Sequence, residues 1–309
     1  MTALFAKRPL WLGVAAVVLI AGTLSTSTGR RLAQKCLSSL RVQKVQAVNV
    51  DLTAFTDPNA NPALHQMIAQ MISDKVNTPV NESDQPAADA AEATRLAGFP
   101  VALLKSRQDV PKLVVGGRHS MSLAVDRARL QEIVKAAGHP EIALPASLDG
   151  ATVSVQIPHT VHLQYGTCPG RTTATDAIAK QVVTTPASPN QYADCVRLTE
   201  GPSPTVDVPA GLNVVQLAEI GLQVAGMTPS QADEFFRTVD WKQTLTLSVP
   251  RQLRSYAQVK VAGVDGTLLT LSGRRGPGYT LIWARNGIVN SLTGYGDSSK
   301  AVELADSLR

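Results

Sequence analysis

Residues 9–29 form an uncharged run near the start of the chain, PLWLGVAAVVLIAGTLSTSTG. At about 1.5 Å rise per residue, a helix of that length matches the ~30 Å hydrocarbon core of a bilayer. Trp11 lies near one end, where interfacial aromatic side chains are favoured. The pattern predicts a transmembrane signal anchor over 9–29 behind a short cytoplasmic tail, 1–8. A cleaved signal peptide is the alternative, because the tail is basic, although no A-x-A site follows.

The net charge of +5 is concentrated before residue 45. Seven basic residues and no acidic residue lie in 1–44, which leaves 22 of the 29 basic groups beside all 24 acidic groups in 45–309. The body of the protein is therefore near neutral. The clustered positive charge typical of a nucleic-acid-binding protein is missing from it, so we expect no nucleic-acid partner.

The side of the membrane on which the body lies is decided by two opposing signals. The flank after the run has more Lys and Arg than the flank before it, which alone would place the body in the cytoplasm. Cys168 and Cys195, however, flank a stretch rich in Pro, Thr, Ser and Asn, which suits a disulfide and an oxidising compartment. Two unrelated buried thiols are the alternative. We expect a bridge contributing ~3 kcal/mol, an extracytoplasmic body, and no structural role for Cys36.

Periodicity and breakers divide the body into elements. Residues 30–86 are expected to be a juxtamembrane segment and linker, with 76–86 its polar part, and the globular body is expected over 87–309. Helical spacing and capping signals predict helices over 63–74, 87–99, 127–138, 211–226, 227–241 and from Asp297. The signals for 227–241 include a capping box of Thr228 and Gln231. Alternating patterns predict strands within 112–126, 151–166, 194–209, 244–250, 257–273 and 279–296.

Glycine-containing dipeptides predict the turns between these strands. Gly116-Gly117 and Asp265-Gly266 are typical hairpin signals, and Asn286-Gly287 suits a type I′ turn because both central positions need a positive φ. Pairing across the last turn sets Trp283 opposite Asn290, and Leu281 opposite Leu292. The whole pattern predicts an α+β fold with a curved antiparallel sheet and helices on one face.

The sequence offers little that suggests chemistry. His159 and His162 are three residues apart in a predicted strand, where they face opposite ways. His65, His119 and His139 are isolated, so we expect no metal site and no cofactor. The stretch GRRGPG at 273–278 lacks the ending of a phosphate-binding loop, and we expect it to be a flexible loop between two strands. The acidic residues, Glu200 among them, are expected on solvated faces, with no pair to nominate for catalysis.

Five segments in order carry a resemblance: AAEATRLAGFPVALL, VHLQYG, VKVAGVDGTLL, LIWARNGIVNSLTG and ELADSLR. Together they resemble a bacterial family of membrane-anchored domains of unknown function in the extracytoplasmic part of anti-sigma-factor-like regulators. That family is similar in fold to the LolA and RseB lipoprotein-carrier group, an open half-barrel sheet with helices over its concave face. The resemblance covers 87–309, with 167–250 partly an insertion, and implies binding of a lipid or a partner protein outside the cytoplasm.

These observations lead to three functional hypotheses. The first is a non-enzymatic, membrane-anchored sensor or binding domain that acts as an accessory regulator, since the residues before the run leave no room for a sigma-binding domain. The second is a carrier or chaperone for acyl chains, which an apolar cavity of a few hundred Å³ would favour over a filled core. The third is a secreted hydrolase, which would require a cleft with convergent acid and base groups.

Overall fold

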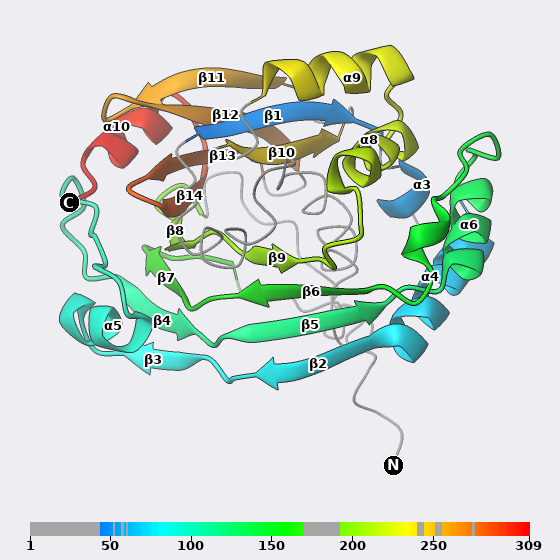
Figure 1. Ribbon diagram of the computed structural model, residues 1–309. Helices are drawn as coiled ribbons and strands as arrows, with labels where there is room; N and C mark the ends of the chain where they lie inside the picture. Colours follow the sequence, from blue (N-terminus) through cyan, green and yellow to red (C-terminus); the bar gives the residue numbers. More distant parts are fainter. Residues whose placement is uncertain are drawn as a thin grey trace.

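The computed structural model describes residues 44–51, 53–56, 59, 61–169, 192–239, 244–250, 255–273 and 276–309. Within these residues the chain has a mixed α+β fold built mainly on antiparallel sheets (Figure 1). The run at 9–29 and Cys36 lie outside the described residues. In the described part of the chain, no helix is both long enough and apolar enough to cross a membrane.

Four long segments of chain each cross between a four-stranded sheet and an eight-stranded one, and Figure 1 shows β4 and β5 lying end to end. The four segments are β2 (Val76–Asn81) with β3 (Gln85–Ala87), β4 (Lys112–Gly116) with β5 (His119–Ala124), β6 (Thr152–Ile157) with β7 (Thr160–Tyr165), and β8 (Val196–Pro202) with β9 (Thr205–Asp207). The four-stranded sheet has the order β2-β5-β6-β9. Proline interrupts two of the segments, at Pro158 and Pro204, because it cannot donate to a strand ladder.

The eight-stranded sheet is completed by the C-terminal part of the chain. Its order is β11-β12-β13-β14-β8-β7-β4-β3, so that β14 pairs with β8 and joins the C-terminal hairpins to the four crossing segments. The added strands are β11 (Ser255–Val261), β12 (Val264–Gly273), β13 (Gly276–Arg285) and β14 (Ile288–Tyr295). The described residues of the stretch at 273–278, expected to be a loop, belong to the strands themselves: Gly273 ends β12 and pairs with Gly276, which begins β13.

A separate two-stranded sheet departs from the expected antiparallel arrangement. It pairs β1 (Lys44–Val50) in parallel with β10 (Thr244–Pro250). β1 packs on β12 and β13, and the Thr267 hydroxyl donates to the Val45 carbonyl oxygen at 3.3 Å. A parallel pair between segments this far apart in sequence has no local signal, because no turn connects the two strands.

Local sequence accounts for most helix starts. The helices are α3 (Thr53–Thr56), α4 (Pro62–Lys75), α5 (Ala90–Ala97), α6 (Arg127–Ala136), α8 (Val214–Val224), α9 (Pro229–Thr238) and α10 (Lys300–Asp306). Asn61, Asp89 and Asp126 each cap a helix with a side-chain oxygen that accepts from a first-turn N–H. The predicted capping box of Thr228 and Gln231 is present at α9.

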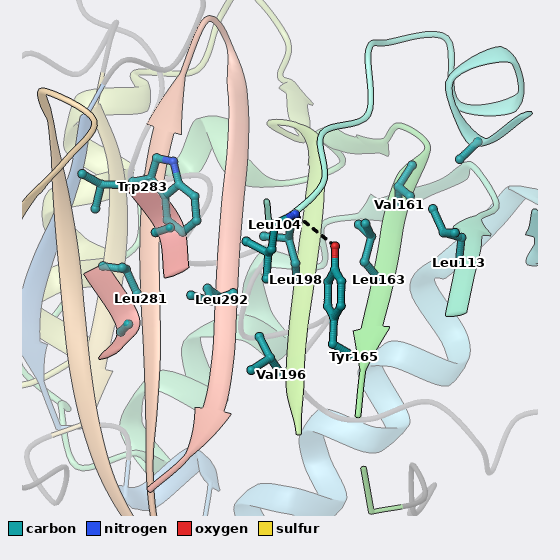
Figure 2. Close-up of a cluster of buried hydrophobic side chains, with 14 of the residues drawn as sticks. Leu104, Leu113, Val161, Leu163, Tyr165, Val196, Leu198, Leu281, Trp283 and Leu292 are labelled. Atoms are coloured by element: carbon teal, nitrogen blue, oxygen red, sulfur yellow. Dashed lines mark hydrogen bonds between the residues drawn. The ribbon is translucent and has the colours of Figure 1, made fainter. Parts of the chain in front are cut away.

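The largest core lies on one face of the eight-stranded sheet (Figure 2). Cross-strand registers place its residues in rows, one of which runs through Leu113, Leu163, Leu198, Leu292 and Leu281. α5, the segment after it and α10 cover these rows. Burying each leucine contributes about 2 kcal/mol, which makes this face the main source of stability. A second core lies under α6 and α8, and a third joins β1 to α8 and α9.

Two of the expected hairpin turns are wrong. β4 and β5 do not pair with each other, since β4 pairs with β3 and β7 while β5 pairs with β2 and β6. Gly117 lies instead at the crossing between the sheets, where a Cβ would overlap the backbone of Glu82. The glycine pair therefore permits a close approach of two chains and does not form a turn.

The second wrong turn is Asp265-Gly266, which lies inside β12. The turn between β11 and β12 is Ala262-Gly263, with φ values of 46° and 85°. Gly266 lies opposite Trp283, and a Cβ there would come within 3.3 Å of the Trp283 Cβ. The close approach of β13 at Gly266 accompanies this register, and the turn then contains a non-glycine residue with positive φ, Ala262. The Asn286-Gly287 turn is confirmed, with Trp283 opposite Asn290.

Two expected boundaries also differ from the structure. Residues 76–86, expected to be a linker, supply β2 and the start of β3 at one edge of the sheets. The segment 167–250 contains β8, which lies between β7 and β14 in the eight-stranded sheet and is not peripheral. The first segment is rich in polar residues and proline, which hides its strands from a reading of periodicity alone.

Gly294 provides a test of this packing. A Cβ at Gly294 would overlap the ring and hydroxyl of Tyr279, whereas a Cβ at the exposed Gly211 would meet no atom within 4 Å. We expect Gly294→Ala to lower the free energy of unfolding by about 1–3 kcal/mol, since overpacking displaces a buried aromatic ring. Gly211→Ala is the matched control and should be nearly neutral. Urea unfolding measures both, and equal effects would contradict the assigned packing.

Candidate functional site

Residues 99–109, here called the strap, cross the apolar face of the eight-stranded sheet between α5 and β4. Phe99 and Leu104 of the strap are buried in the main core. The Leu104 N–H donates to the Tyr165 hydroxyl at 3.0 Å, as Figure 2 shows, and the Ala102 N–H donates to the Glu200 carboxylate at 3.1 Å. The strap is thus fixed to side chains of β7 and β8 through its own backbone.

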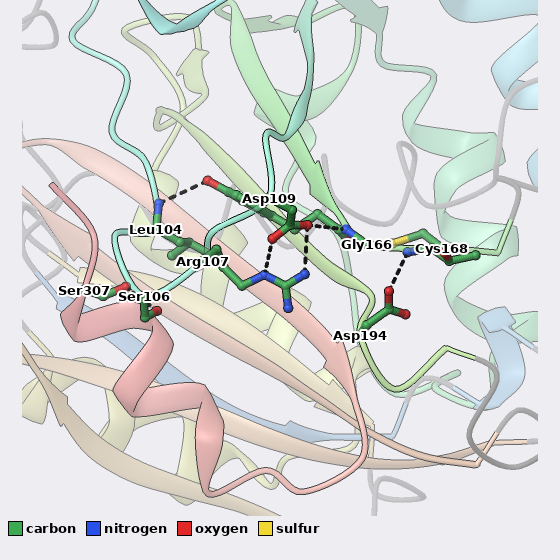
Figure 3. Close-up of polar contacts among 10 residues, drawn as sticks. Leu104, Ser106, Arg107, Asp109, Gly166, Cys168, Asp194 and Ser307 are labelled. Atoms are coloured by element: carbon green, nitrogen blue, oxygen red, sulfur yellow. Dashed lines mark hydrogen bonds and ion pairs between the residues drawn. The ribbon is translucent and has the colours of Figure 1, made fainter.

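The strap also holds the residues that follow α10. The Leu103 N–H donates to the Arg309 carbonyl at 2.9 Å, and the Arg309 N–H returns a bond to the Leu103 carbonyl at 3.1 Å. The Lys105 N–H donates to the Ser307 carbonyl at 3.1 Å. The hydroxyls of Ser106 and Ser307 share a further bond of 2.8 Å (Figure 3). The strap and residues 307–309 therefore form one short antiparallel ribbon.

The far end of the strap is tied by an ion pair. The Arg107 guanidinium donates two hydrogen bonds to the Asp109 carboxylate, at 2.7 and 2.9 Å, and lies 5.8 Å from the centre of the Tyr165 ring. Asp109 also accepts from the Gly166 N–H at 2.8 Å (Figure 3). The bonds from Arg107 hold the pKa of the Asp109 carboxyl below its usual range. The strap is thereby joined to the end of β7.

A disulfide lies beside this junction. Cys168 and Cys195 are bonded, as predicted, with their Cα atoms 4.9 Å apart. The bridge joins the chain after β7 to the residue before β8, two neighbouring strands of the sheet. Next to it the Thr167 N–H donates to the Asp194 carboxylate at 3.1 Å (Figure 3). Residues 170–191, which the bridge encloses, lie outside the described residues.

Glu200 departs most from expectation, because it lies in the core and not on a solvated face. Its exposed fraction is 3 %, and it occupies a row of the apolar face between Val161 of β7 and Asn290 of β14. In the described part of the chain, the Ala102 N–H is its one hydrogen-bond donor. Burial raises the pKa of the Glu200 carboxyl to about 7. Asn290 is equally buried and directs its amide to the Ile288 carbonyl.

The two histidines of the β6–β7 segment lie near the crossing between the sheets. His159 Nδ1 lies 3.0 Å from the Gly116 carbonyl oxygen, and its Nε2 lies 3.6 Å from the Glu82 carboxylate. His162 lies between the hydroxyls of Thr160 and Thr199, at 3.2 and 3.1 Å. Hydrogen bonds from Arg118 lower the pKa of Glu82 to about 2. Over the described residues, no three His, Cys, Asp or Glu side chains form a group that could hold a metal ion.

An open hollow of about 620 Å³ lies between α4 and α6. Its lining consists of Met67, Gln70, Asp126, Arg127, Ala128, Arg129, Gln131 and Glu132. Arg129 is paired with Asp74 at 2.8 Å, and Asp126 lies 3.9 Å from the Lys75 amine. No sequence pattern predicts this hollow, because the two helices that form it are far apart in the chain.

Sequence analysis also missed the strap and Glu200, although a signal for Glu200 exists. Val196, Leu198 and Glu200 are alternate residues of β8, so the alternation that buries the first two also turns Glu200 inward. No comparable signal marks the strap.

Comparison of the chain with family models, with curated proteins and with solved structures found no match. The function is therefore inferred from this chain's own residues.

The buried carboxyl makes the stability depend on pH. The pKa of Glu200 is about 7 in the folded chain, against an ordinary value of 4.5 when unfolded. Its contribution to stability is therefore fully present below about pH 4.5 and is lost as pH rises through about 7. We expect the free energy of unfolding to fall by about 3 kcal/mol across this range in the wild type, and Glu200→Gln to remove this fall.

Chemical denaturation at a series of pH values measures the effect. Glu303→Gln is the control, because Glu303 is an exposed residue of α10 and its substitution should leave the pH dependence as in the wild type. If Glu200→Gln shows the same dependence of unfolding free energy on pH as the wild type, Glu200 is not the titrating group.

Proposed function

We propose that the protein is a membrane-anchored, extracytoplasmic sensor or binding domain, an accessory regulator that recognises a partner and catalyses no reaction. The Cys168–Cys195 disulfide is the observation that carries this proposal. Disulfides persist in oxidising compartments and are rare in the cytosol. The bridge links neighbouring strands in the sheet and closes a loop whose constraint contributes about 3 kcal/mol.

The uncharged run at 9–29 supports the same location. It is long enough to span a bilayer as a single helix. A single anchor of this kind would hold the body at the outer surface of the membrane. The membrane is then the first partner that we propose for the chain.

The placement of the five resembling segments supports a regulatory ectodomain. They correspond to α5 with the first part of the strap, most of β7, the β11–β12 hairpin, the β13–β14 hairpin, and most of α10 with its tail. All five contribute to the main core. We propose on this basis an open half-barrel similar to the LolA and RseB group, formed by the eight-stranded sheet with helices over one face.

The packing favours recognition of a protein partner over transport of a lipid. A carrier needs apolar space of a few hundred Å³. Leu163, Leu198 and Leu281 on the covered face are at most 1 % exposed, so this face is filled by the chain's own side chains. The hollow between α4 and α6 has four charged residues in its lining, which does not suit an acyl chain.

The location is tested by topology and disulfide mapping. We expect a C-terminal alkaline phosphatase fusion to be active, and a C-terminal green fluorescent protein fusion exported in the same way to be dark. Non-reducing peptide mapping of the membrane fraction should recover the peptides of Cys168 and Cys195 joined to each other, with Cys36 as the unpaired control. A cytosolic C-terminus, or free thiols at both positions, would reject the proposed location.

The choice between a binding domain and a carrier is tested by the bound lipid. We expect the full-length chain, purified from native membranes and exchanged through detergent, to retain well under one lipid per molecule, because its apolar face is filled. Mass spectrometry of extracted lipids measures this ratio, and a denatured sample gives the background. One tightly retained apolar lipid per chain would favour the carrier instead.

A further inference from the structure

We propose that Glu200 and the strap form a proton-controlled latch, in which ionisation of the carboxyl releases residues 99–109 and, with them, residues 307–309 from the sheet. The latch goes beyond the proposed function, because it describes how the fold itself responds to pH. The contacts of the strap support the latch, which does not depend on the side of the membrane that the body occupies.

The first step is the poor solvation of Glu200 in the closed state. An ionised carboxylate has about four acceptor sites, and a buried charge is costly unless several donors satisfy it. In the described part of the chain, Glu200 receives one bond, from the Ala102 N–H at 3.1 Å. Its neighbours in the row are Val161, which offers no polar side-chain atom, and Asn290, whose amide bonds to Ile288. A charged Glu200 therefore requires water.

The elements packed around Glu200 supply no compensating charge. Tyr165 of β7 is held neutral, because burial raises the pKa of its phenol and the charge of Glu200 adds to this. Arg107 and Asp109 of the strap are paired with each other. Other charged groups of the covering segments have partners elsewhere or are exposed. Arg95 pairs with Glu92 on α5, and Asp306 of α10 accepts from the Ala262 N–H. Lys105 of the strap is exposed to solvent.

The second step is that the strap is itself the cover over Glu200, so water reaches the carboxylate when the strap lifts. Consecutive strap amides point alternately to the sheet and to the tail. Those of Ala102 and Leu104 donate to Glu200 and Tyr165, while those of Leu103 and Lys105 donate to Arg309 and Ser307. Because the two sets alternate along one short segment, displacement at Ala102 also strains the ribbon with residues 307–309.

The direction of the switch follows from the pKa of Glu200, about 7 in the closed state against 4.5 for an exposed carboxyl. The closed state holds the proton, so acid favours closure and a rising pH favours opening. Between pH 6 and pH 8 the opening constant should rise about tenfold, because it increases by up to a factor of ten per pH unit between the open-state and closed-state pKa values and levels off above the closed-state pKa of about 7. Opening uncovers Leu163 and Leu198, an apolar surface suited to a partner protein.

Hydrogen exchange of the full-length chain in detergent, read by mass spectrometry at pH 6 and pH 8, tests the latch. After correction for the intrinsic exchange rate, we expect peptides covering 101–106 and 306–309 to lose about tenfold more protection at pH 8 than at pH 6. Peptides from α6 should show no such change. Glu200→Gln, which keeps the shape of the side chain without its charge, should remain protected at both pH values.

Tyr165→Phe distinguishes an effect of Glu200 titration from a general weakening of the contacts that hold the strap. It removes the bond to the Leu104 N–H, so it should weaken protection of the strap while leaving the tenfold pH effect in place. A pH effect that persists in Glu200→Gln would overturn the latch. If Glu200→Gln does not fold, the wild type alone decides: a single step in strap protection with its midpoint near pH 7 supports the latch, and a profile without that step overturns it.

Discussion

The pairing of β8 with β7 on one side and with β14 on the other is the interaction on which the rest of the structure depends. It joins the four crossing segments to the C-terminal hairpins, and without it the eight-stranded sheet would divide into two parts. Leu198 lies at the centre of the leucine row that crosses this joint, and the disulfide fixes the start of β8 to the end of β7. Hydrophobic burial and a covalent bond therefore stabilise the same strand.

The same strand carries the one buried carboxyl of the main core in the described part of the chain. Glu200 interrupts an apolar row, and the strap that covers it receives its backbone partners from β7, β8 and the residues after α10. The N-terminal half of the body and its C-terminal end are thereby linked through one eleven-residue segment. A buried ionisable group at such a link lowers stability once it is ionised, which suits the switching role proposed for it.

Sequence reasoning succeeded where the signal is local. The Asn286-Gly287 turn and the capping box at Thr228 depend on a few consecutive residues, and both are present. It failed where a glycine is needed for close contact with a residue far away in the sequence. Gly117 fits against Glu82, and Gly266 fits against Trp283, so each dipeptide resembles a turn while its real constraint comes from another strand. Polar edge strands such as β2 were missed for the related reason that exposure on both faces removes alternation.

The mixture of helices and antiparallel strands, the last hairpin with its register, and the pairing of Cys168 with Cys195 follow from short stretches of the chain, through periodicity, positive-φ turns and cysteine spacing. Long-range packing places four segments across two sheets, lays the strap over Glu200 and pairs residues 307–309 with Leu103 and Lys105. These features arise from contacts between distant residues, where burial and hydrogen-bond satisfaction outweigh local preference.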